Sequence, residues 1–218
     1  MSFKAIIFDL DGTLIDSLED LGNATNRVLL KNNFPTHTME DYRYFVGEGV
    51  VALITRALPE EIRDEATINA CVGEFREDYR KNWNIKTKLY EGIAEMLDSV
   101  TLRGLKMAVL SNKPDYFTKK CVAEFLPKWN FERVIGQRDN VPKKPDPAGA
   151  DEIAEHLAIL PSEILYLGDT PIDMKTATAA GMFPVGVLWG FRPEDELKRS
   201  GAQRVIHKPQ ELMKVIDH

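Results

Sequence analysis

The chain has 218 residues, of which 44% are hydrophobic and 28% are charged, a balance typical of a globular protein rather than a disordered or membrane protein. Its net charge of -6 argues against a nucleic-acid-binding surface, which needs a clustered basic face. No apolar run approaches the roughly 18 residues of a membrane span, and AIIF after Lys4 is far too short for a signal peptide. We therefore expect a cytoplasmic protein without nucleic-acid or membrane partners, and the sequence leaves monomer or dimer open.

Short apolar runs, each too brief for a helix, indicate buried strands. The first is KAIIFDL at 4–10, and runs of the same type follow at 105–112, 132–137, 163–170, 183–190 and 203–208. Helical patterns lie between them, at 91–104, 114–126, 147–160 and 171–181. Strands that alternate with helices predict an α/β fold, a Rossmann-like parallel sheet covered on both faces, which binds ligands at the carboxyl ends of its strands.

The segment 17–85 interrupts this alternation, because its patterns are helical throughout. One helix is expected to begin at Ser17, and a second at Thr38 with an interruption at 47–49. A third is expected to carry apolar positions from Ile62 to Trp83. The sequence thus predicts a helical-bundle domain inserted after the first strand of an α/β core. The expected boundaries are 1–16 and 86–218 for the core domain and 17–85 for the inserted domain.

Polar side chains collect where the predicted strands end. They are Asp9, Asp11, Ser111, Asn112, Lys144, Asp169 and Asp173. The carboxyl ends of parallel strands meet at one edge of a sheet, so we expect these groups to converge there. Several carboxylates at one edge cannot all stay ionised unless a cation joins them. Oxygen ligands beside a hydroxyl and a lysine suit Mg²⁺ together with a phosphate group, so the sequence predicts a site for both.

Four motifs at these strand ends resemble those of the haloacid dehalogenase superfamily. They are FDLDGT (8–13), LSNK (110–113), KPDP (144–147) and GDTPID (168–173). Each stands at the expected strand end and in the expected order. The sequence looks closest to the superfamily's phosphatases with a helical cap after the first strand, in particular phosphoglycolate phosphatase. Within the expected cap, only VGEG (46–49) resembles the family.

The resemblance implies a Mg²⁺-dependent phosphatase that hydrolyses a small phosphomonoester through an aspartyl-phosphate intermediate. Asp9 would be the nucleophile, and Asp11 would be the general acid and then the general base. Lys144 would stabilise the charge that develops on the phosphoryl group. Its partner would be a small phosphorylated metabolite, since a helical cap that closes over the site excludes water and macromolecules.

The resemblance also implies the ligands of the phosphate and the metal. Ser111, the Asn112 amide and Lys144 would bind the phosphoryl oxygens. Mg²⁺ would be bound by Asp9, the backbone carbonyl of Asp11, Asp169 and Asp173, the last directly or through water.

The two lysines of VPKKPDP can be distinguished by backbone geometry. Pro145 restricts Lys144 to an extended backbone, and neighbouring side chains of an extended stretch point to opposite sides. The family's lysine directly precedes the proline, so we expect Lys144 at the site and Lys143 on the surface.

Several alternatives stay open at this point. Asp11 favours phosphate esters over dehalogenation or phosphonate hydrolysis, but a pyrophosphatase, a sugar-phosphate or nucleotide phosphatase and β-phosphoglucomutase remain compatible. A non-enzymatic phosphate-binding module would be expected to have lost Asp9 or Asp11, and both are present. Substrate selection falls to the inserted domain, where possible contacts are Gly47, Glu48, Gly49, Arg43 and Arg56. Either arginine could pair with a substrate carboxylate or be an ordinary solvated helix charge.

Overall fold

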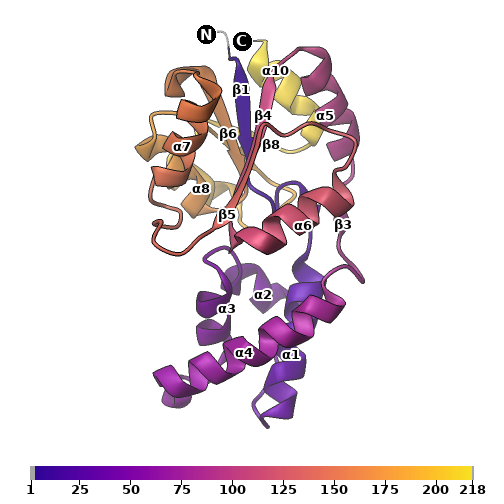
Figure 1. Cartoon of the computed structure of the whole chain (residues 1–218), viewed down its shortest axis with the longest axis vertical. Helices are drawn as coiled ribbons and strands as arrows, with labels where there is room; N and C mark the ends of the chain where they lie inside the picture. The colour runs from indigo at the N-terminus through magenta and orange to yellow at the C-terminus, as the bar shows by residue number, and fades with distance from the viewer. Residues whose placement is uncertain (1–2, 218) are drawn as a thin grey trace. The chain divides into compact units, whose positions relative to one another are not determined.

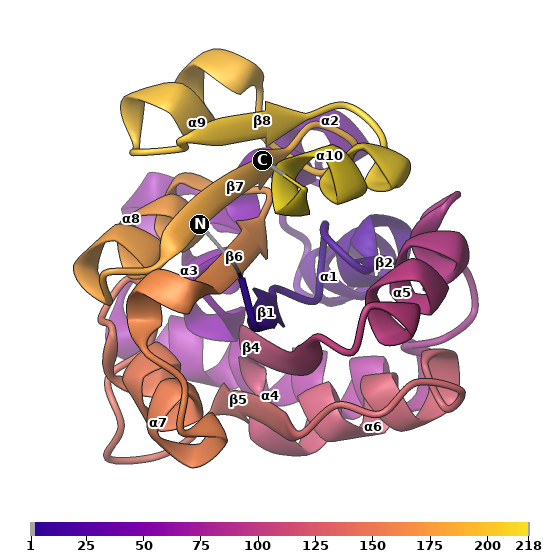
Figure 2. The same cartoon turned by 90° about the horizontal axis from the view of Figure 1, so that it is seen from above.

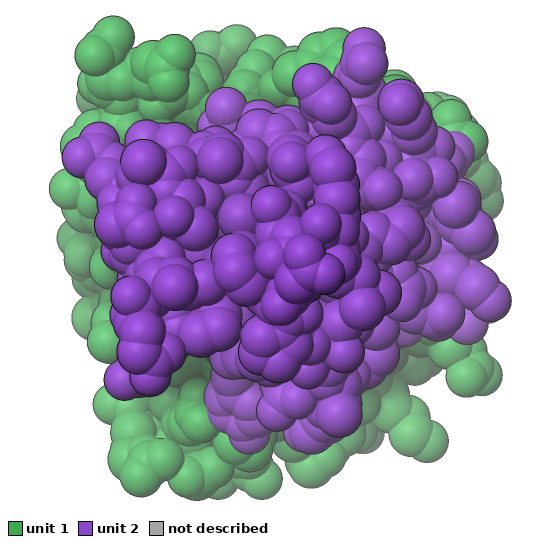
Figure 3. Space-filling model, turned by 90° about the horizontal axis from the view of Figure 1, so that it is seen from below, with its two compact units in different colours: residues 1–15, 89–218 green, residues 16–88 purple. Residues whose placement is uncertain are grey.

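The computed structural model describes residues 3–217 and divides the chain into two compact units. One lies within residues 1–15 and 89–218, and the other comprises residues 16–88 (Figure 3). The first contains the main sheet and the second is mostly helical. Among the described residues, no helix is long and apolar enough to cross a membrane.

The larger unit is built on a six-stranded sheet in the order β5-β4-β1-β6-β7-β8, in which all neighbours are parallel. The strands are β1 (Ala5–Phe8), β4 (Lys106–Pro114), β5 (Arg133–Gln137), β6 (Ile164–Gly168), β7 (Phe183–Val187) and β8 (Arg204–Ile206). Every residue of β1 is buried, because the sheet is covered on both faces. These are the six predicted strands, so the predicted α/β fold is confirmed.

Helices cover the two faces of the sheet (Figures 1 and 2). Figure 2 shows α7 (Ala148–Leu157) and α8 (Pro171–Ala179) on one face, and α5 (Ile93–Leu102), α6 (Asp115–Phe125) and α10 (Leu212–Ile216) on the other. The short helix α9 (Glu194–Arg199) packs beside β7 and β8. Two 3₁₀ turns, Pro161–Glu163 and Pro209–Glu211, complete the unit. Helix α5 buries Ile93, Met96, Leu97 and Val100, an apolar stripe at helical spacing.

The strand order decides which chain segments meet at the carboxyl edge of the sheet. Strand β1 lies between β4 and β6, and Phe8 is level with Val109 on one side and Leu167 on the other. The residues that directly follow these three strand positions are therefore neighbours, although about 100 and 60 residues separate them along the chain.

The smaller unit contains α1 (Leu18–Lys31), α2 (Met39–Phe45), α3 (Val50–Ala57) and α4 (Glu65–Asn82). The break between α2 and α3 falls at the predicted place. The third predicted helix is wrong at its start, because α4 begins after Asp64, whose side chain accepts a hydrogen bond from the backbone N–H of Thr67. Ile62 lies instead in a separate 3₁₀ turn, Glu60–Ile62.

The two ends of the helical segment lie side by side. Strand β2 (Ile15–Asp16) pairs with β3 (Lys88–Leu89) in a two-stranded sheet. The buried carboxylate of Asp20, near the start of α1, accepts hydrogen bonds of 2.8–3.1 Å from the backbone N–H groups of Lys86 and Thr87. These short hydrogen bonds satisfy the buried Asp20 carboxylate and connect α1 to the segment that precedes β3. That this unit is a cap domain stays a prediction.

Candidate functional site

The turn after β1 presents Asp9 at the carboxyl edge of the sheet. The Asp9 side chain is nearly buried, and its Oδ1 accepts a 2.7 Å hydrogen bond from the backbone N–H of Leu10. Gly12 has a φ of 87°, in the left-handed region that favours glycine. A Cβ atom there would also lie 2.3 Å from a carboxylate oxygen of Asp169. Glycine is thus required both by the turn and by the close approach of Asp169.

Three buried carboxylates meet at this edge. Asp9, Asp169 and Asp173 each offer an oxygen, and these oxygens lie within 4.8 Å of one another. Burial, together with the charge of Asp173, raises the pKa of Asp9 to about 7. Burial and the charges of Asp173 and Asp9 raise the pKa of Asp169 well above its ordinary value. Three ionised carboxylates are therefore unfavourable here without further positive charge, which a divalent cation bound by oxygen ligands would supply.

Asp169 is held by hydrogen bonds to both of its oxygens. The Thr13 hydroxyl donates to Oδ1 at 3.1 Å, and the backbone N–H of Phe191 donates to Oδ2 at 2.8 Å. The indole N–H of Trp189 donates to the Thr13 carbonyl at 2.9 Å. A Cβ atom at Gly190 would lie 2.3 Å from the Cβ of Asp169.

The segment 189–191, which holds Asp169, follows β7 at the same edge of the sheet. Sequence reasoning did not include it in the site. The signal that could have found it is the glycine that ends the predicted strand 183–190, beside other strand ends that carry site residues.

Asp173 combines a local role with a place in the carboxylate cluster. It lies in the first turn of α8, where its Oδ2 accepts from the backbone N–H and the hydroxyl of Thr170 at 3.0 and 2.6 Å. Its Oδ1 lies 2.7 Å from Nζ of Lys144. The helix start therefore fixes the orientation of a carboxylate that also faces the site.

Lys144 is a buried cation beside the carboxylate cluster. Its Nζ lies 2.9 Å from Oδ1 of Asp9 and donates to the carbonyl of Leu110 at 3.0 Å, besides its contact with Asp173. Burial acts to lower the pKa of Lys144, but the charges of Asp173 and Asp9 raise it well above its usual value. Lys144 is thus a fixed positive charge, whereas the side chain of Lys143 is exposed, as the extended backbone predicts.

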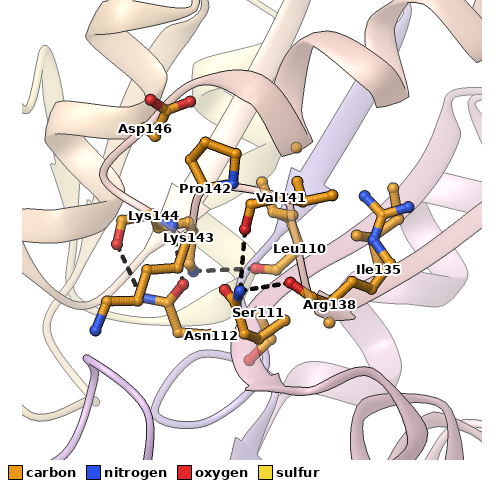
Figure 4. Close-up of a pocket in the computed structure, with 13 residues that line it drawn as sticks. Leu110, Ser111, Asn112, Ile135, Arg138, Val141, Pro142, Lys143, Lys144 and Asp146 are labelled. Atoms are coloured by element: carbon orange, nitrogen blue, oxygen red, sulfur yellow. Dashed lines mark hydrogen bonds between the residues drawn. The ribbon is translucent and has the colours of Figure 1, made fainter. Parts of the chain in front are cut away.

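Asn112 positions the backbone of Lys144 (Figure 4). Its Oδ1 accepts from the backbone N–H of Lys144 at 2.9 Å, and its Nδ2 donates to the Lys144 carbonyl at 3.1 Å. Asn112, Ser111 and Lys144 line one narrow pocket, and all three are buried. The family resemblance implied a role for the Asn112 amide toward phosphate, which stays a prediction, and it did not predict these hydrogen bonds to the Lys144 peptide groups.

The remaining predicted residues divide between the two units. In the larger unit, the carboxylate of Asp11 faces Nζ of Lys113 at 3.0 and 3.2 Å. In the smaller unit, the guanidinium of Arg56 contacts the Glu48 carboxylate and donates to the carbonyls of Tyr44 and Phe45. Arg56 therefore supports the loop between α2 and α3.

Gly47 and Gly49 lie in the same loop between α2 and α3, and Arg43 lies in α2 just before it. Gly47 and Gly49 have φ values of 117° and 88°, which only glycine adopts without strain. Arg43 lies 3.9 Å from Glu40, a surface ion pair of small energetic value. Contact of Gly47, Glu48, Gly49, Arg43 or Arg56 with a substrate stays a prediction.

The chain is similar to known proteins over most of its length. The family model described as haloacid dehalogenase-like hydrolase matches residues 6–187. A phosphoglycolate phosphatase of Pseudomonas putida is 34% identical over 200 residues, which cover 88% of this chain and 73% of the relative. A phosphoglycolate phosphatase of Aquifex aeolicus is 30% identical over 215 residues, which cover 99% of this chain and 97% of the relative.

Solved structures agree with this sequence similarity. The crystal structure of a protein from Lactobacillus delbrueckii subsp. bulgaricus superposes with a TM-score of 0.93 at 29% identity, with 99% of each chain covered. A hydrolase from Pseudomonas syringae superposes with a TM-score of 0.77 at 26% identity, with 98% of each chain covered.

The raised pKa of Asp9 predicts how the stability of the metal-free protein depends on pH. Between the ordinary value of 3.8 and about 7, the folded state binds more protons at Asp9 than the unfolded state. The contribution of Asp9 to folding stability therefore falls as pH rises through this window. In the presence of a chelator, the unfolding free energy of Asp9→Asn relative to that of the wild type should increase by up to about 2 kcal/mol between about pH 5 and about pH 7.5. The difference in melting temperature between the two proteins should change in the same direction.

Comparison of the two proteins cancels the titration of groups outside the cluster. Added Mg²⁺ should stabilise the wild type more than Asp9→Asn at the higher pH. A difference in melting temperature that does not change with pH would contradict the assignment of the raised pKa to Asp9.

Proposed function

This chain belongs to the haloacid dehalogenase-like hydrolase family, and from that premise we propose that it is a Mg²⁺-dependent phosphatase of small phosphomonoesters. The observation that carries the proposal is the contact of one buried lysine with two of three clustered carboxylates, one of which, Asp9, directly follows the central strand β1. A carboxylate held at a strand end beside a fixed cation is suited to attack an anionic phosphoryl group, because the cation offsets the repulsion between them.

The residues present fit a magnesium ion. Asp9, Asp169 and Asp173 are buried oxygen donors whose raised pKa values or close approach favour a cation, and the backbone carbonyl of Asp11 would add a neutral oxygen. When bound, Mg²⁺ would neutralise the charge of these carboxylates and of the phosphoryl oxygens.

The first step forms a phosphorylated enzyme. An oxygen of Asp9 attacks phosphorus, the bond between phosphorus and the ester oxygen breaks, and Asp11 gives a proton to the departing oxygen. Lys144, the Ser111 hydroxyl and the backbone N–H of Asn112 would stabilise the phosphoryl oxygens as the charge redistributes.

The second step restores the enzyme. Asp11, now a carboxylate, takes a proton from a water molecule as the water oxygen attacks phosphorus. The bond between phosphorus and Asp9 breaks, Asp9 regains its carboxylate, and inorganic phosphate leaves. The same residue can therefore act first as acid and then as base, because the first step leaves Asp11 deprotonated.

Phosphoglycolate is the substrate that we propose first. Its support is the similarity to phosphoglycolate phosphatases of Pseudomonas putida and Aquifex aeolicus over most of this chain. Such a substrate carries a carboxylate besides its phosphate, so a cationic side chain should select it over phosphate esters that lack a second negative group.

A panel of small phosphate compounds tests this function. Phosphate release from phosphoglycolate should exceed release from sugar phosphates, nucleotides and pyrophosphate in catalytic efficiency, and exhaustive chelation should abolish it. Conversion of β-glucose 1-phosphate to a second sugar phosphate would favour a mutase instead. Full turnover after chelation would refute the metal assignment.

Covalent labelling separates the two aspartates of the β1 turn. Asp9→Asn should abolish transfer of labelled phosphate from substrate to protein, since the nucleophile is lost. Asp11→Asn should still accept phosphate from an ester with a good leaving group and then release it slowly, because only proton transfer is impaired. Mass spectrometry of the quenched protein detects the adduct, and labelled Asp9→Asn would reverse the roles.

The neighbouring lysines provide a matched pair of variants. Lys144→Ala should lower kcat by roughly a hundredfold or more, the scale for loss of one preorganised charge stabiliser. Lys143→Ala, one residue away and exposed, should change kcat by no more than a few-fold. Steady-state kinetics decides between them, with thermal melting as the check on folding. A larger loss for Lys143→Ala would show that Lys144 has been wrongly matched to the lysine of the family's motif.

A further inference from the structure

Lys113 is a buried cation that the proposed mechanism does not use. It ends the LSNK motif in β4, and its side chain is only 5% exposed. Lysine is almost never buried unless it is paired. Its Nζ lies 3.0 Å from Oδ1 and 3.2 Å from Oδ2 of Asp11, whose side chain is 13% exposed. The pairing of Lys113 with both oxygens restricts rotation of the Asp11 carboxylate.

The backbone of Lys113 is itself firmly placed. Its N–H donates to Oγ of Ser111 at 3.2 Å, and its carbonyl accepts from the hydroxyl of Thr118, in α6, at 3.0 Å. A Cβ atom at Gly136 would lie 2.6 Å from the Lys113 carbonyl, so β5 packs closely against the same peptide. The cation thus extends from a rigid strand end rather than from a mobile loop, which makes it an effective anchor.

The two buried lysines of the site contact different carboxylates. Lys144 contacts Asp9 and Asp173, whereas Lys113 contacts Asp11. The attacking carboxylate and the proton-transferring carboxylate are therefore contacted by different cations, Lys144 from the segment after β5 and Lys113 from the end of β4. Removal of one lysine should affect one task more than the other.

We propose that Lys113 is a positioning residue that holds the Asp11 carboxylate in place for proton transfer to the leaving oxygen. This inference rests on the proposed function, in which Asp11 is the general acid. In this role Lys113 acts on the substrate only through the Asp11 side chain that it holds. Since proton transfer needs hydrogen-bond distance and alignment, a protonated Asp11 carboxyl group that is free to rotate would protonate the leaving group less often.

The test is the dependence of catalytic efficiency on the leaving group. kcat/KM reports the steps up to departure of the ester oxygen, so it isolates the acid role of Asp11. Lys113→Met should lower kcat/KM for alkyl phosphates by about tenfold or more, because an alkoxide needs a proton. For nitrophenyl phosphate, whose leaving group departs without one, the loss should stay within about threefold.

A double-mutant cycle tests whether Lys113 acts through Asp11. In the Asp11→Asn background, addition of Lys113→Met should change kcat/KM for alkyl phosphates by less than about threefold, because the group that Lys113 positions is already impaired. Lys106→Met is the matched control, since Lys106 begins the same strand and donates to the carbonyl of Leu157. It should leave kcat/KM unchanged for both classes of ester.

The outcomes separate this inference from the proposed function. An equal loss for alkyl and nitrophenyl esters, or additive losses in the cycle, would overturn the positioning role of Lys113. If Lys113→Met does not melt cooperatively, Lys113→Gln, whose uncharged amide keeps N–H donors, should show the same leaving-group dependence with a smaller loss. Failure of the proposed function has a different signature: the wild type would release no phosphate from any ester, or Asp9→Asn would keep its activity.

Discussion

The site depends on one buried ion-pair cluster, in which the ammonium group of Lys144 lies between Asp9 and Asp173. A lone buried carboxylate or lysine would be neutralised by a shift of its pKa. Here Asp9 and Asp173 keep the charge of Lys144, whereas burial and the neighbouring carboxylates disfavour the negative charge of Asp169, which this single lysine does not balance. The excess of carboxylates is the physical reason that a bound cation would stabilise this site, and in the proposed function the same cation would offset the charge of a phosphate.

The parallel sheet makes this cluster feasible from residues far apart in the chain. Strand β1 is short, fully buried and flanked by β4 and β6, so three strand ends deliver polar groups to one edge. The polar groups are then held by local devices: the Thr170 cap for Asp173 and the backbone N–H of Phe191 for Asp169. Rigid elements place the groups, and hydrogen bonds from neighbouring segments orient them, which is what preorganisation requires.

The sequence predicted the positions that are fixed by periodicity and by residue type. Apolar runs identified the six strands of the main sheet, and the charged residues that follow these runs predicted that Asp9, Lys144 and Asp169 meet at one edge. It did not reveal contacts that depend on a backbone group or on a turn several residues away. The Phe191 N–H has no residue signature, and the start of α4 moved because Asp64 caps the helix. The hydrogen bond between Asn112 and the Lys144 backbone joins two segments that are distant along the chain and are brought together only by the fold.

That hold has a consequence for how this site tolerates change in chain length. Lys144 comes from the segment after β5, but both of its peptide groups are fixed by Asn112 of β4. The position of the cation is therefore set by the neighbouring strand and not by the number of residues between β5 and Lys144. Insertions or deletions within 138–143 would alter the exposed part of this segment, while the lysine would keep its place because closing a slightly longer loop costs little entropy.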